Sequence, residues 1–130
     1  MCIFCKIVAK EIPATYVYED DKVIVILDIS QVTKGHTLVL PKEHYSNIYQ
    51  VDPELLKHMI SVTQSIAIKL KTKLSANGIN ILNNNEIAAN QSVDHIHFHI
   101  IPRYDDNDGF KCEFQASNHD LNDVIKIINK

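Results

Sequence analysis

The stretch His95-Ile96-His97-Phe98-His99-Ile100-Ile101 decides the fold of this chain. Histidine alternates with an apolar residue, and side chains along a β-strand point to opposite faces in turn. We therefore predict a strand over residues 93–101, ended by Pro102. Its apolar side chains must face a core. That leaves three imidazoles together on the other face, with neighbouring ones about 7 Å apart at their Cα atoms.

The flanking sequence predicts a mixed α+β domain. Other strand-like segments, separated by turn residues, are 15–19, 22–28, 36–40 and 78–82. A long helical segment lies between the third and fourth strands in chain order, and a short one precedes the first. We predict a single domain over residues 1–130: a five-stranded, largely antiparallel sheet with a long inserted helix and a short N-terminal helix.

The long helix has clear start and stop signals. Asp52 can cap its free N–H groups, and Pro53 suits the first helical position. Apolar residues then recur every three or four positions until Asn77 and Gly78, where the helix is predicted to end. The N-terminal helix is expected over residues 3–8. A terminal helix is expected after Ser117 or Asn118, with its apolar positions at Leu121, Val124, Ile125 and Ile128.

Length and composition exclude several classes of protein. The chain has 130 residues, 45% of them apolar, with only 3 glycines and 4 prolines, which excludes disordered and collagen-like chains. Because 16 acidic residues outnumber 13 basic ones, no field that would attract a nucleic-acid polymer is expected. We find no signal peptide and no apolar run of membrane-spanning length. We therefore expect a soluble, cytoplasmic protein without membrane partners.

Three imidazoles on one face suit two kinds of chemistry. If all were protonated they would repel, so some must be neutral or paired with an anion or a metal. In one interpretation, alternate histidines are zinc ligands. In the other, one imidazole is a nucleophile toward phosphorus, a neighbour holds its tautomer, and another donates to the phosphate or the leaving group.

The motif resembles the histidine triad superfamily, in which three histidines alternate with apolar residues and two more apolar residues follow. Other segments are similar to its HINT-like branch of small nucleotide hydrolases: Ile3-Phe4-Cys5-Lys6-Ile7, Glu11-Ile12-Pro13, Glu19-Asp20-Asp21, Leu27-Asp28-Ile29, Pro41-Lys42-Glu43-His44 and Gln91-Ser92-Val93. The resemblance implies a homodimer that joins its two sheets. It also implies hydrolysis or transfer of a nucleoside monophosphate, with a purine base expected, from phosphoramidates, acyl adenylates or similar conjugates.

The resemblance assigns roles to individual histidines. The middle one, His97, would be the nucleophile and would carry a covalent nucleotidyl intermediate. His99 would contact the phosphate and the leaving group. His95 and His44 would form a supporting pair that sets the geometry, and no catalytic metal would be required.

The resemblance also implies a nucleotide site. Asp28 would bind the ribose hydroxyls, and a carboxylate that accepts two such hydrogen bonds is chemically suited to this. Around the phosphate and the base, the implied contacts are Asn84, Gln91, Ser92, His99, Ile3, Phe4, Ile7 and Ile26. For the four apolar residues among them, packing in the core is an equally good interpretation.

One segment departs from the family pattern. Between Asn84 and Gln91 the family usually carries glycines that bring backbone N–H groups close to phosphate, but this chain has Glu86 and Asn90 there. Asn90 can take a left-handed turn conformation, whereas Glu86 adds bulk and negative charge near an anion. A nucleotide-binding interaction protein with little turnover is therefore the alternative to an enzyme.

Cys2 and Cys5 form a Cys-x-x-Cys pair, which in a cytosolic chain indicates metal or redox chemistry rather than a structural disulfide. A thioredoxin-like motif would need a preceding strand, and we expect none before residue 2. Two histidines would complete a zinc site, and the candidates are His44 and His95, as in cysteine-bearing relatives of the triad family. We expect a structural zinc ion there. Small apolar packing of both thiols is the alternative. Cys112 is expected to be an ordinary thiol.

Two further expectations concern the remaining histidines. His36, His58 and His119 belong to no recognisable cluster, so a partly buried or solvent-facing role is expected for them. A third function, a metal-dependent hydrolase with zinc on His95 and His97, ranks last because no carboxylate lies nearby in the sequence to serve as a ligand or base.

Overall fold

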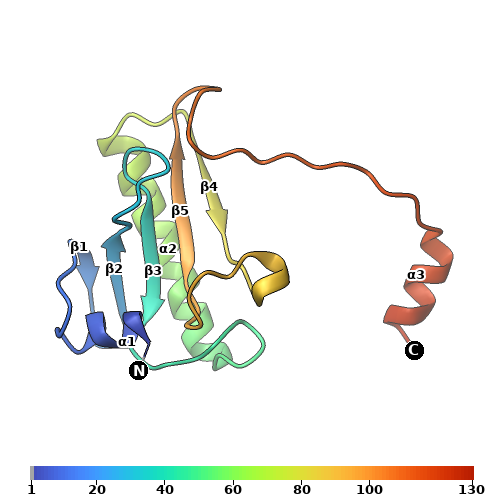
Figure 1. Ribbon diagram of the computed structural model, residues 1–130, viewed down its shortest axis with the longest axis horizontal. Coiled ribbons are helices and arrows are strands. Elements are labelled where there is room, and N and C mark those ends of the chain that lie inside the picture. The colour runs from blue at the N-terminus through green and yellow to red at the C-terminus, as the bar shows by residue number, and fades with distance from the viewer. Residues whose placement is uncertain (1) are drawn as a thin grey trace.

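The computed structural model describes residues 2–130 and contains a five-stranded sheet (Figure 1). Its strands are β1 (Tyr16–Glu19), β2 (Val23–Leu27), β3 (Thr37–Pro41), β4 (Gly78–Leu82) and β5 (Phe98–Arg103). Their order across the sheet is β1-β2-β3-β5-β4, and every neighbouring pair is antiparallel. The predicted α+β class and its antiparallel sheet are confirmed.

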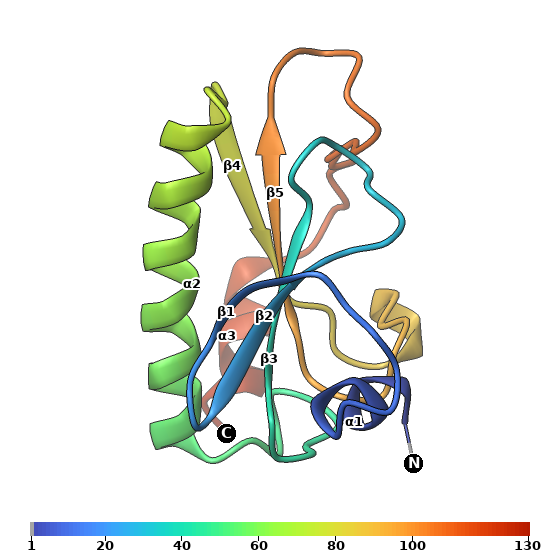
Figure 2. The same ribbon diagram turned by 90° about the vertical axis from the view of Figure 1, so that its left-hand side faces the viewer.

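Two of the helices cover the faces of the sheet, and the third lies away from it. The helices are α1 (Ile3–Val8), α2 (Pro53–Lys73) and α3 (Leu121–Ile128), with a short 3-10 turn, η1 (Ile87–Ala89), and α3 is the one away from the sheet. Figure 2 shows α2 along one face of the sheet and α1 against the other. As predicted, Asp52 caps α2, because its carboxylate accepts a hydrogen bond from the Leu55 N–H at 3.2 Å. Across the described residues, no helix combines the length and apolar character needed to span a bilayer.

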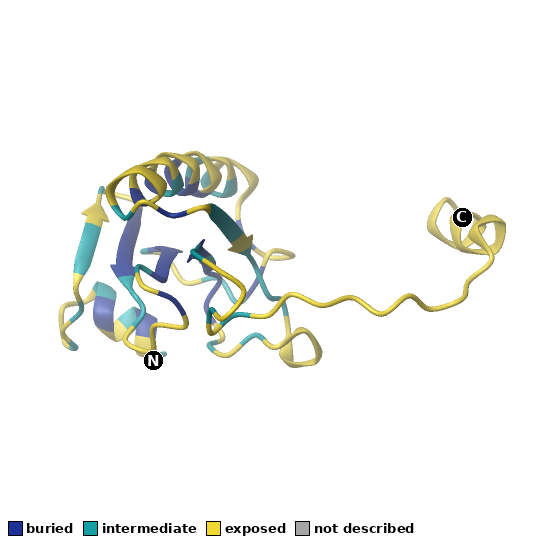
Figure 3. Cartoon of the chain, turned by 90° about the horizontal axis from the view of Figure 1, so that it is seen from above, coloured by how far each residue is buried: buried dark blue, intermediate teal, exposed yellow. Residues whose placement is uncertain are grey.

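The alternation of side chains divides the interior into two apolar clusters. One lies between the sheet and α2 and includes Ile96, Phe98 and Ile100 from the triad stretch. The other lies between the sheet and α1 and includes Phe4, Ile7, Ile24, Ile26, Leu38 and Leu40. Figure 3 shows buried residues in the strands and on the inner side of α2. The predicted core face of the histidine stretch is therefore the α2 face.

The strand that carries the triad is shorter than predicted at its start. Residues 93–95 form a bend, residues 96 and 97 pair with no strand, and β5 begins only at Phe98. The reason is a different set of partners: the His95 N–H bonds back to the Val93 carbonyl at 2.8 Å, and the Ile96 N–H bonds to the Tyr45 carbonyl at 2.7 Å. At the other end, β5 continues through Pro102 to Arg103, where β3 no longer pairs with it.

Two helix boundaries also differ from expectation. α2 ends at Lys73 rather than at Asn77-Gly78, because Ser75 takes the left-handed conformation, with φ 54°, and the Ala76 N–H bonds to the Lys71 carbonyl. Gly78 instead begins β4. α3 is capped by Asp120, whose carboxylate accepts from the N–H groups of Asn122 and Asp123, and not by Ser117 or Asn118.

His58 has a partner that sequence reasoning did not find. Its Nε2 lies 2.7 Å from a carboxylate oxygen of Asp20, in the turn between β1 and β2. The Asp20 carboxylate also accepts hydrogen bonds from the Tyr18 hydroxyl and from the N–H groups of Lys22 and Val23. Burial opposes its ionisation, but these bonds together hold the pKa of Asp20 well below its usual range. Asp20 therefore ties the first hairpin to α2.

We expect Asp20→Asn to lower the free energy of unfolding by about 2 kcal/mol at pH 7, because charge-assisted hydrogen bonds to two backbone N–H groups and His58 are weakened. Since the pKa of Asp20 is lower in the folded chain than in the unfolded one, its stabilisation is complete above about pH 4 and is lost as the pH falls further. Urea unfolding at pH 7 and pH 3 tests this. Equal losses at both pH values would contradict it.

Candidate active site

The triad stretch is covered by the N-terminal helix. His95 and His97 lie on the α1 face and are 0% and 3% exposed, whereas His99 is half-buried. The Phe4 ring of α1 meets both buried imidazoles edge-on, at centroid distances of 5.8 Å from His95 and 5.0 Å from His97. The three imidazoles share one face, as predicted, but that face is not an open surface.

The tautomer of His97 is set by the backbone. Its Nδ1 lies 2.8 Å from the His95 carbonyl oxygen, which can only accept, so Nδ1 must carry the proton. In the neutral ring the other nitrogen, Nε2, is then an unprotonated lone pair. Asn83 holds this stretch in place, because its side-chain amide donates to the His97 carbonyl at 3.0 Å. His97 therefore has the form that a nucleophile needs.

His36, which was expected to have no partner, is part of the site. Its Nε2 lies 2.8 Å from His99 Nδ1 and 3.6 Å from the Asp28 carboxylate, and its own Nδ1 faces the Val32 N–H at 3.4 Å. Because Nδ1 of His36 accepts there, Nε2 carries the proton and donates to His99. Neutral His99 then carries its proton on Nε2. The expectation for His36 was wrong because of strand register. Leu38 on β3 pairs with His99 on β5, and His36, two residues before Leu38, points to the same face of the sheet as His99.

All three triad imidazoles are held neutral at physiological pH. Burial, with a smaller contribution from neighbouring imidazoles, lowers the pKa of His95 and of His99 to about 4. Burial also lowers the pKa values of His97 and His36. The repulsion expected between three charged rings is therefore avoided by burial.

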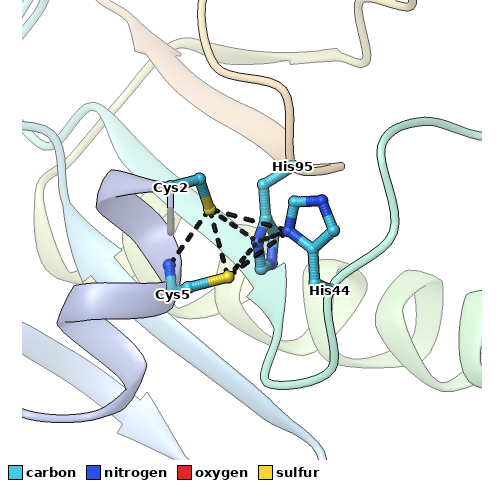
Figure 4. A group of neighbouring side chains, drawn as sticks. All are labelled: Cys2, Cys5, His44 and His95. Atoms are coloured by element: carbon cyan, nitrogen blue, oxygen red, sulfur yellow. Dashed lines mark hydrogen bonds between the residues drawn. The ribbon is translucent and has the colours of Figure 1, made fainter.

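Cys2 and Cys5 meet His44 and His95 in one cluster (Figure 4). Cys2 caps α1 through its sulfur, which accepts from the Cys5 N–H at 3.2 Å, so both thiols lie on the first turn. The two sulfur atoms are 3.2 Å apart, and each lies 3.3–3.6 Å from the Nδ1 atoms of the two histidines. Those two Nδ1 atoms are 3.2 Å apart.

These six distances are close to the edges of a metal tetrahedron. Bonds of about 2.0–2.3 Å from a tetrahedral zinc ion place its sulfur and nitrogen ligands about 3.3–3.8 Å apart. The tautomer of His95 also fits, because its Nε2 donates to the Pro41 carbonyl at 2.8 Å and leaves Nδ1 unprotonated toward the cysteines. The predicted set of four residues can therefore hold a metal. A zinc ion shared by His95 and His97 is disfavoured, because Nε2 of His95 bonds to Pro41 and its one unprotonated nitrogen, Nδ1, lies against the cysteines.

The predicted phosphate-side residues gather around one loop. The Gln91 amide donates to the carbonyls of Ser46 and Val93, and its oxygen accepts from the Glu86 N–H at 2.7 Å. Asn84 donates to the Asn90 carbonyl at 3.3 Å. Ser92 is exposed beside them. Across the site, one Asp28 oxygen accepts from the Ser30 N–H, and the carboxylate is partly exposed.

Two residues of this loop have backbone conformations that glycine favours, in the segment where the family usually carries glycines. Glu86 has φ 75° and ψ 162°, a region that is essentially restricted to glycine, and Asn90 is left-handed with φ 68°. Asn90 takes the turn conformation anticipated for it. Glu86 holds a strained backbone whose cost is about 1–3 kcal/mol.

The residues expected around the base are mostly in the core. Phe4, Ile7 and Ile26 are buried in the cluster between α1 and the sheet, and Ile3 alone of the four is exposed. Phe4, Ile7 and Ile26 therefore pack in the core, and contact of any of the four residues with a base stays a prediction.

Comparison with known proteins identifies the family to which this chain belongs. The HIT domain model matches residues 9–106. Adenosine 5'-monophosphoramidase HNT1 of Candida albicans is 33% identical over 133 residues, which cover 99% of this chain and 88% of that protein.

Two solved structures extend the comparison to the whole fold. A HIT family protein from Bacillus anthracis is 45% identical, and the match covers 98% of this chain and 92% of that one with a TM-score of 0.93. A zinc-bound histidine triad family protein from Mycobacterium smegmatis is 43% identical, with 82% and 77% covered and a TM-score of 0.78. The resemblance inferred from the motif is confirmed: this chain belongs to the HIT domain, or histidine triad, family.

Proposed function

We propose that this protein hydrolyses nucleoside 5'-monophosphate conjugates, above all phosphoramidates, with His97 as the nucleophile. The observation that carries the proposal is the hydrogen bond from His97 Nδ1 to the His95 carbonyl, which leaves Nε2 unprotonated in a neutral ring. The 33% identity to a protein named adenosine 5'-monophosphoramidase supports this reaction and an adenine base.

The proposed reaction has two steps. Nε2 of His97 attacks phosphorus, and the P–N bond to the leaving group breaks. A bound phosphate anion favours the protonated form of nearby imidazoles, so the hydrogen-bonded His36–His99 pair takes up one proton when substrate binds, and His99 passes its Nε2 proton to the leaving nitrogen. Water then attacks the nucleotidyl-His97 intermediate and gives a proton to His99, which releases the nucleoside monophosphate and restores His97. The Asp28 carboxylate would hold the ribose hydroxyls, with Gln91, Ser92 and Asn84 at the phosphate.

A panel of substrates tests the proposal directly. Adenosine 5'-phosphoramidate, an acyl adenylate and a dinucleoside polyphosphate are each offered to the wild-type protein, and release of AMP is measured. We expect the phosphoramidate to have the highest kcat/KM. Absence of turnover on every member of the panel would overturn the proposal.

We expect His36 to position His99, since its Nε2–H donates to His99 Nδ1 over 2.8 Å. His36→Leu should lower kcat by about 10–100-fold with little change in KM, because His99 loses the bond that sets its tautomer. His36→Gln keeps a donor at the place of Nε2 and should restore most of the loss. The two variants are compared in steady-state kinetics on the same phosphoramidate. Equal losses in both would show a packing role instead.

Glu86→Gly is expected to raise turnover and to raise the free energy of unfolding by about 1 kcal/mol. Glycine relieves the strained φ of 75°, partly offset by its greater freedom in the unfolded chain, and removes a carboxylate near the phosphate. Glu86→Ala is the matched control, because it removes the charge but keeps the Cβ atom and the strain. Kinetics and urea unfolding are measured on both. Unchanged or poorer turnover in Glu86→Gly would show that Glu86 does not limit turnover.

The strained loop also motivates a second candidate function, a nucleotide-binding interaction protein with little turnover. In that case AMP would bind tightly, and the substrate panel would show no measurable hydrolysis. Calorimetric titration with AMP alongside the panel distinguishes the two functions.

We further infer that Cys2, Cys5, His44 and His95 hold a structural zinc ion. The near-tetrahedral distances support this, as does the zinc-bound relative from M. smegmatis. Bound zinc would tie α1 to the loop before β5 and fix the His95 ring, whose carbonyl sets the tautomer of His97. No step of the proposed reaction passes through the metal.

A homodimer that joins two sheets is also proposed. β4 lies at one edge of the sheet, so one side of its backbone is free to pair. Ile81 on β4 and Ile60 and Ile68 on α2 are exposed and would be covered. Sedimentation of the full chain tests it.

A further inference from the structure

Cys2 and Cys5 are placed so that their thiols can react with each other. The two sulfur atoms are 3.2 Å apart, and Figure 4 shows both side chains pointing toward His44 and His95. A disulfide bond is about 2 Å long, so the sulfurs need to approach by only about 1 Å. Cys2 is the N-cap residue of α1 and has an extended backbone, so the bond can form while the hydrogen bonds of the helix remain. The Cys-x-x-Cys spacing is also that of reversible thiol pairs.

Both thiols of this pair are open to a small oxidant. Cys2 and Cys5 are partly exposed. The third cysteine, Cys112, lies on the C-terminal arm, residues 111–130, which is exposed throughout. If a peroxide oxidises Cys2 or Cys5 to a sulfenic acid, the other thiol of the pair lies 3.2 Å away and can convert it to a disulfide. Cys112 has no such thiol bonded to it among the described residues, so the pair near α1 is the one that closes a disulfide within the chain.

In the reduced state the two thiols tie α1 to the histidines. Each sulfur lies 3.3–3.6 Å from the Nδ1 atoms of His44 and His95. His95 Nδ1 is an acceptor, because its Nε2 donates to the Pro41 carbonyl. A thiol can donate its S–H to such a nitrogen, and a thiolate can share a metal with it, but a disulfide can do neither. Oxidation therefore removes these polar ties of α1 and leaves its apolar contacts.

The ties matter because α1 covers the triad stretch. The Phe4 ring lies edge-on against His95 and His97, which are 0% and 3% exposed. The His95 carbonyl in turn accepts a hydrogen bond from His97 Nδ1 at 2.8 Å. A helix of 6 residues has little stability of its own, so α1 depends on the groups that it contacts. Loss of contacts at its first turn therefore affects the cover of both buried imidazoles.

We propose that Cys2 and Cys5 are a reversible redox pair, and that its oxidation by hydrogen peroxide loosens α1 from the triad stretch. One thiolate attacks a peroxide oxygen and breaks the O–O bond, which gives a sulfenic acid and, once a proton is added, one water. The second thiol attacks the sulfenic sulfur, and the departing hydroxide takes up that thiol's proton as a second water. In total the two thiols lose two electrons and two protons, and the peroxide is reduced to two waters.

The oxidised pair is restored by a dithiol, which exchanges with the disulfide and becomes a disulfide itself. A zinc ion held by the pair would be released on oxidation, because the thiolate is the form of cysteine that binds a metal. The inference rests on the positions of the two thiols and does not depend on the proposed hydrolysis or on the proposed dimer.

Oxidation of the full wild-type chain with hydrogen peroxide tests the proposal. After trypsin digestion, the peptide that ends at Lys6 should be about 2 Da lighter, as a disulfide between its two cysteines requires. Hydrogen exchange of the α1 amides should become at least about tenfold faster. Dithiothreitol should reverse both changes. Thiols that stay reduced, thiols that go to sulfinic acid instead, or a disulfide that leaves α1 exchange unchanged would each overturn the proposal.

Matched serine variants separate this pair from oxidation elsewhere in the chain. Cys112→Ser removes a thiol outside the pair and should respond to peroxide like the wild type, whereas Cys5→Ser should show neither the loss of mass nor the faster exchange. NMR of the 15N-labelled histidine rings gives a second readout in the wild type: oxidation should shift the Nδ1 signal of His95 and leave that of His119, on the arm, in place. Equal responses of the two variants, or a His95 signal that does not move, would contradict the proposal.

Discussion

His97→Asn is expected to lower kcat/KM for adenosine 5'-phosphoramidate by at least about 10⁴-fold, equivalent to about 5.5 kcal/mol of transition-state stabilisation. The asparagine amide can still donate to the His95 carbonyl, so the local hydrogen bond survives. What is lost is the lone pair that His97 Nε2 offers to phosphorus. Initial rates of AMP release, measured over a range of substrate concentrations, give the comparison.

His119→Asn is the matched control, because His119 lies on the exposed arm, away from the triad. It should retain wild-type turnover. A covalent adduct provides a second readout: with a slow substrate, intact-protein mass spectrometry should detect a nucleotidyl group on the wild type and none on His97→Asn. Turnover that survives His97→Asn, or an adduct on another residue, would assign the nucleophile elsewhere.

The main fold could be predicted because its signals are local. Alternation in the triad stretch identified which side chains enter the core, and Ile96, Phe98 and Ile100 pack there. Asp52 and Pro53 marked the start of α2. The end of α2 was missed because Ser75 supplies the left-handed residue that glycine usually supplies, and sequence alone does not indicate such a substitution.

The site was predicted in part. The cluster of Cys2, Cys5, His44 and His95 followed from counting ligands and from the family resemblance, and the structure brings all four together. His36 was missed because its role depends on strand register, which pairs β3 with β5 across more than 60 residues of sequence. The position of α3 was equally hidden, since its amphipathic pattern predicts a covered face without identifying the surface that covers it.

Loss of the metal is expected to have the largest effect on stability. If zinc occupies the cluster at about 1,000 times its dissociation constant, binding adds about 4 kcal/mol to the free energy of unfolding. For a chain of 130 residues this corresponds to a fall in Tm of at least about 10 °C on removal. Cys5→Ser should reproduce the fall, because it removes a thiolate ligand that lies 3.3 Å from His44 Nδ1 and 3.6 Å from His95 Nδ1. Calorimetry of protein purified without a histidine tag, with and without a chelator, measures both effects.

Cys112→Ser is the matched control for Cys5→Ser. It also removes one thiol, but Cys112 is an exposed cysteine on the arm, outside the cluster. It should bind one zinc ion per chain and melt like the wild type, whereas Cys5→Ser should do neither. If zinc is substoichiometric and both cysteine variants melt like the wild type, the two thiols near α1 are packing groups only.

Since His95 links the cluster to His97 through its carbonyl, a zinc ion that stabilises the fold should also support turnover. Chelation is therefore expected to reduce kcat through the geometry of His97, and restored zinc should recover both kcat and Tm together.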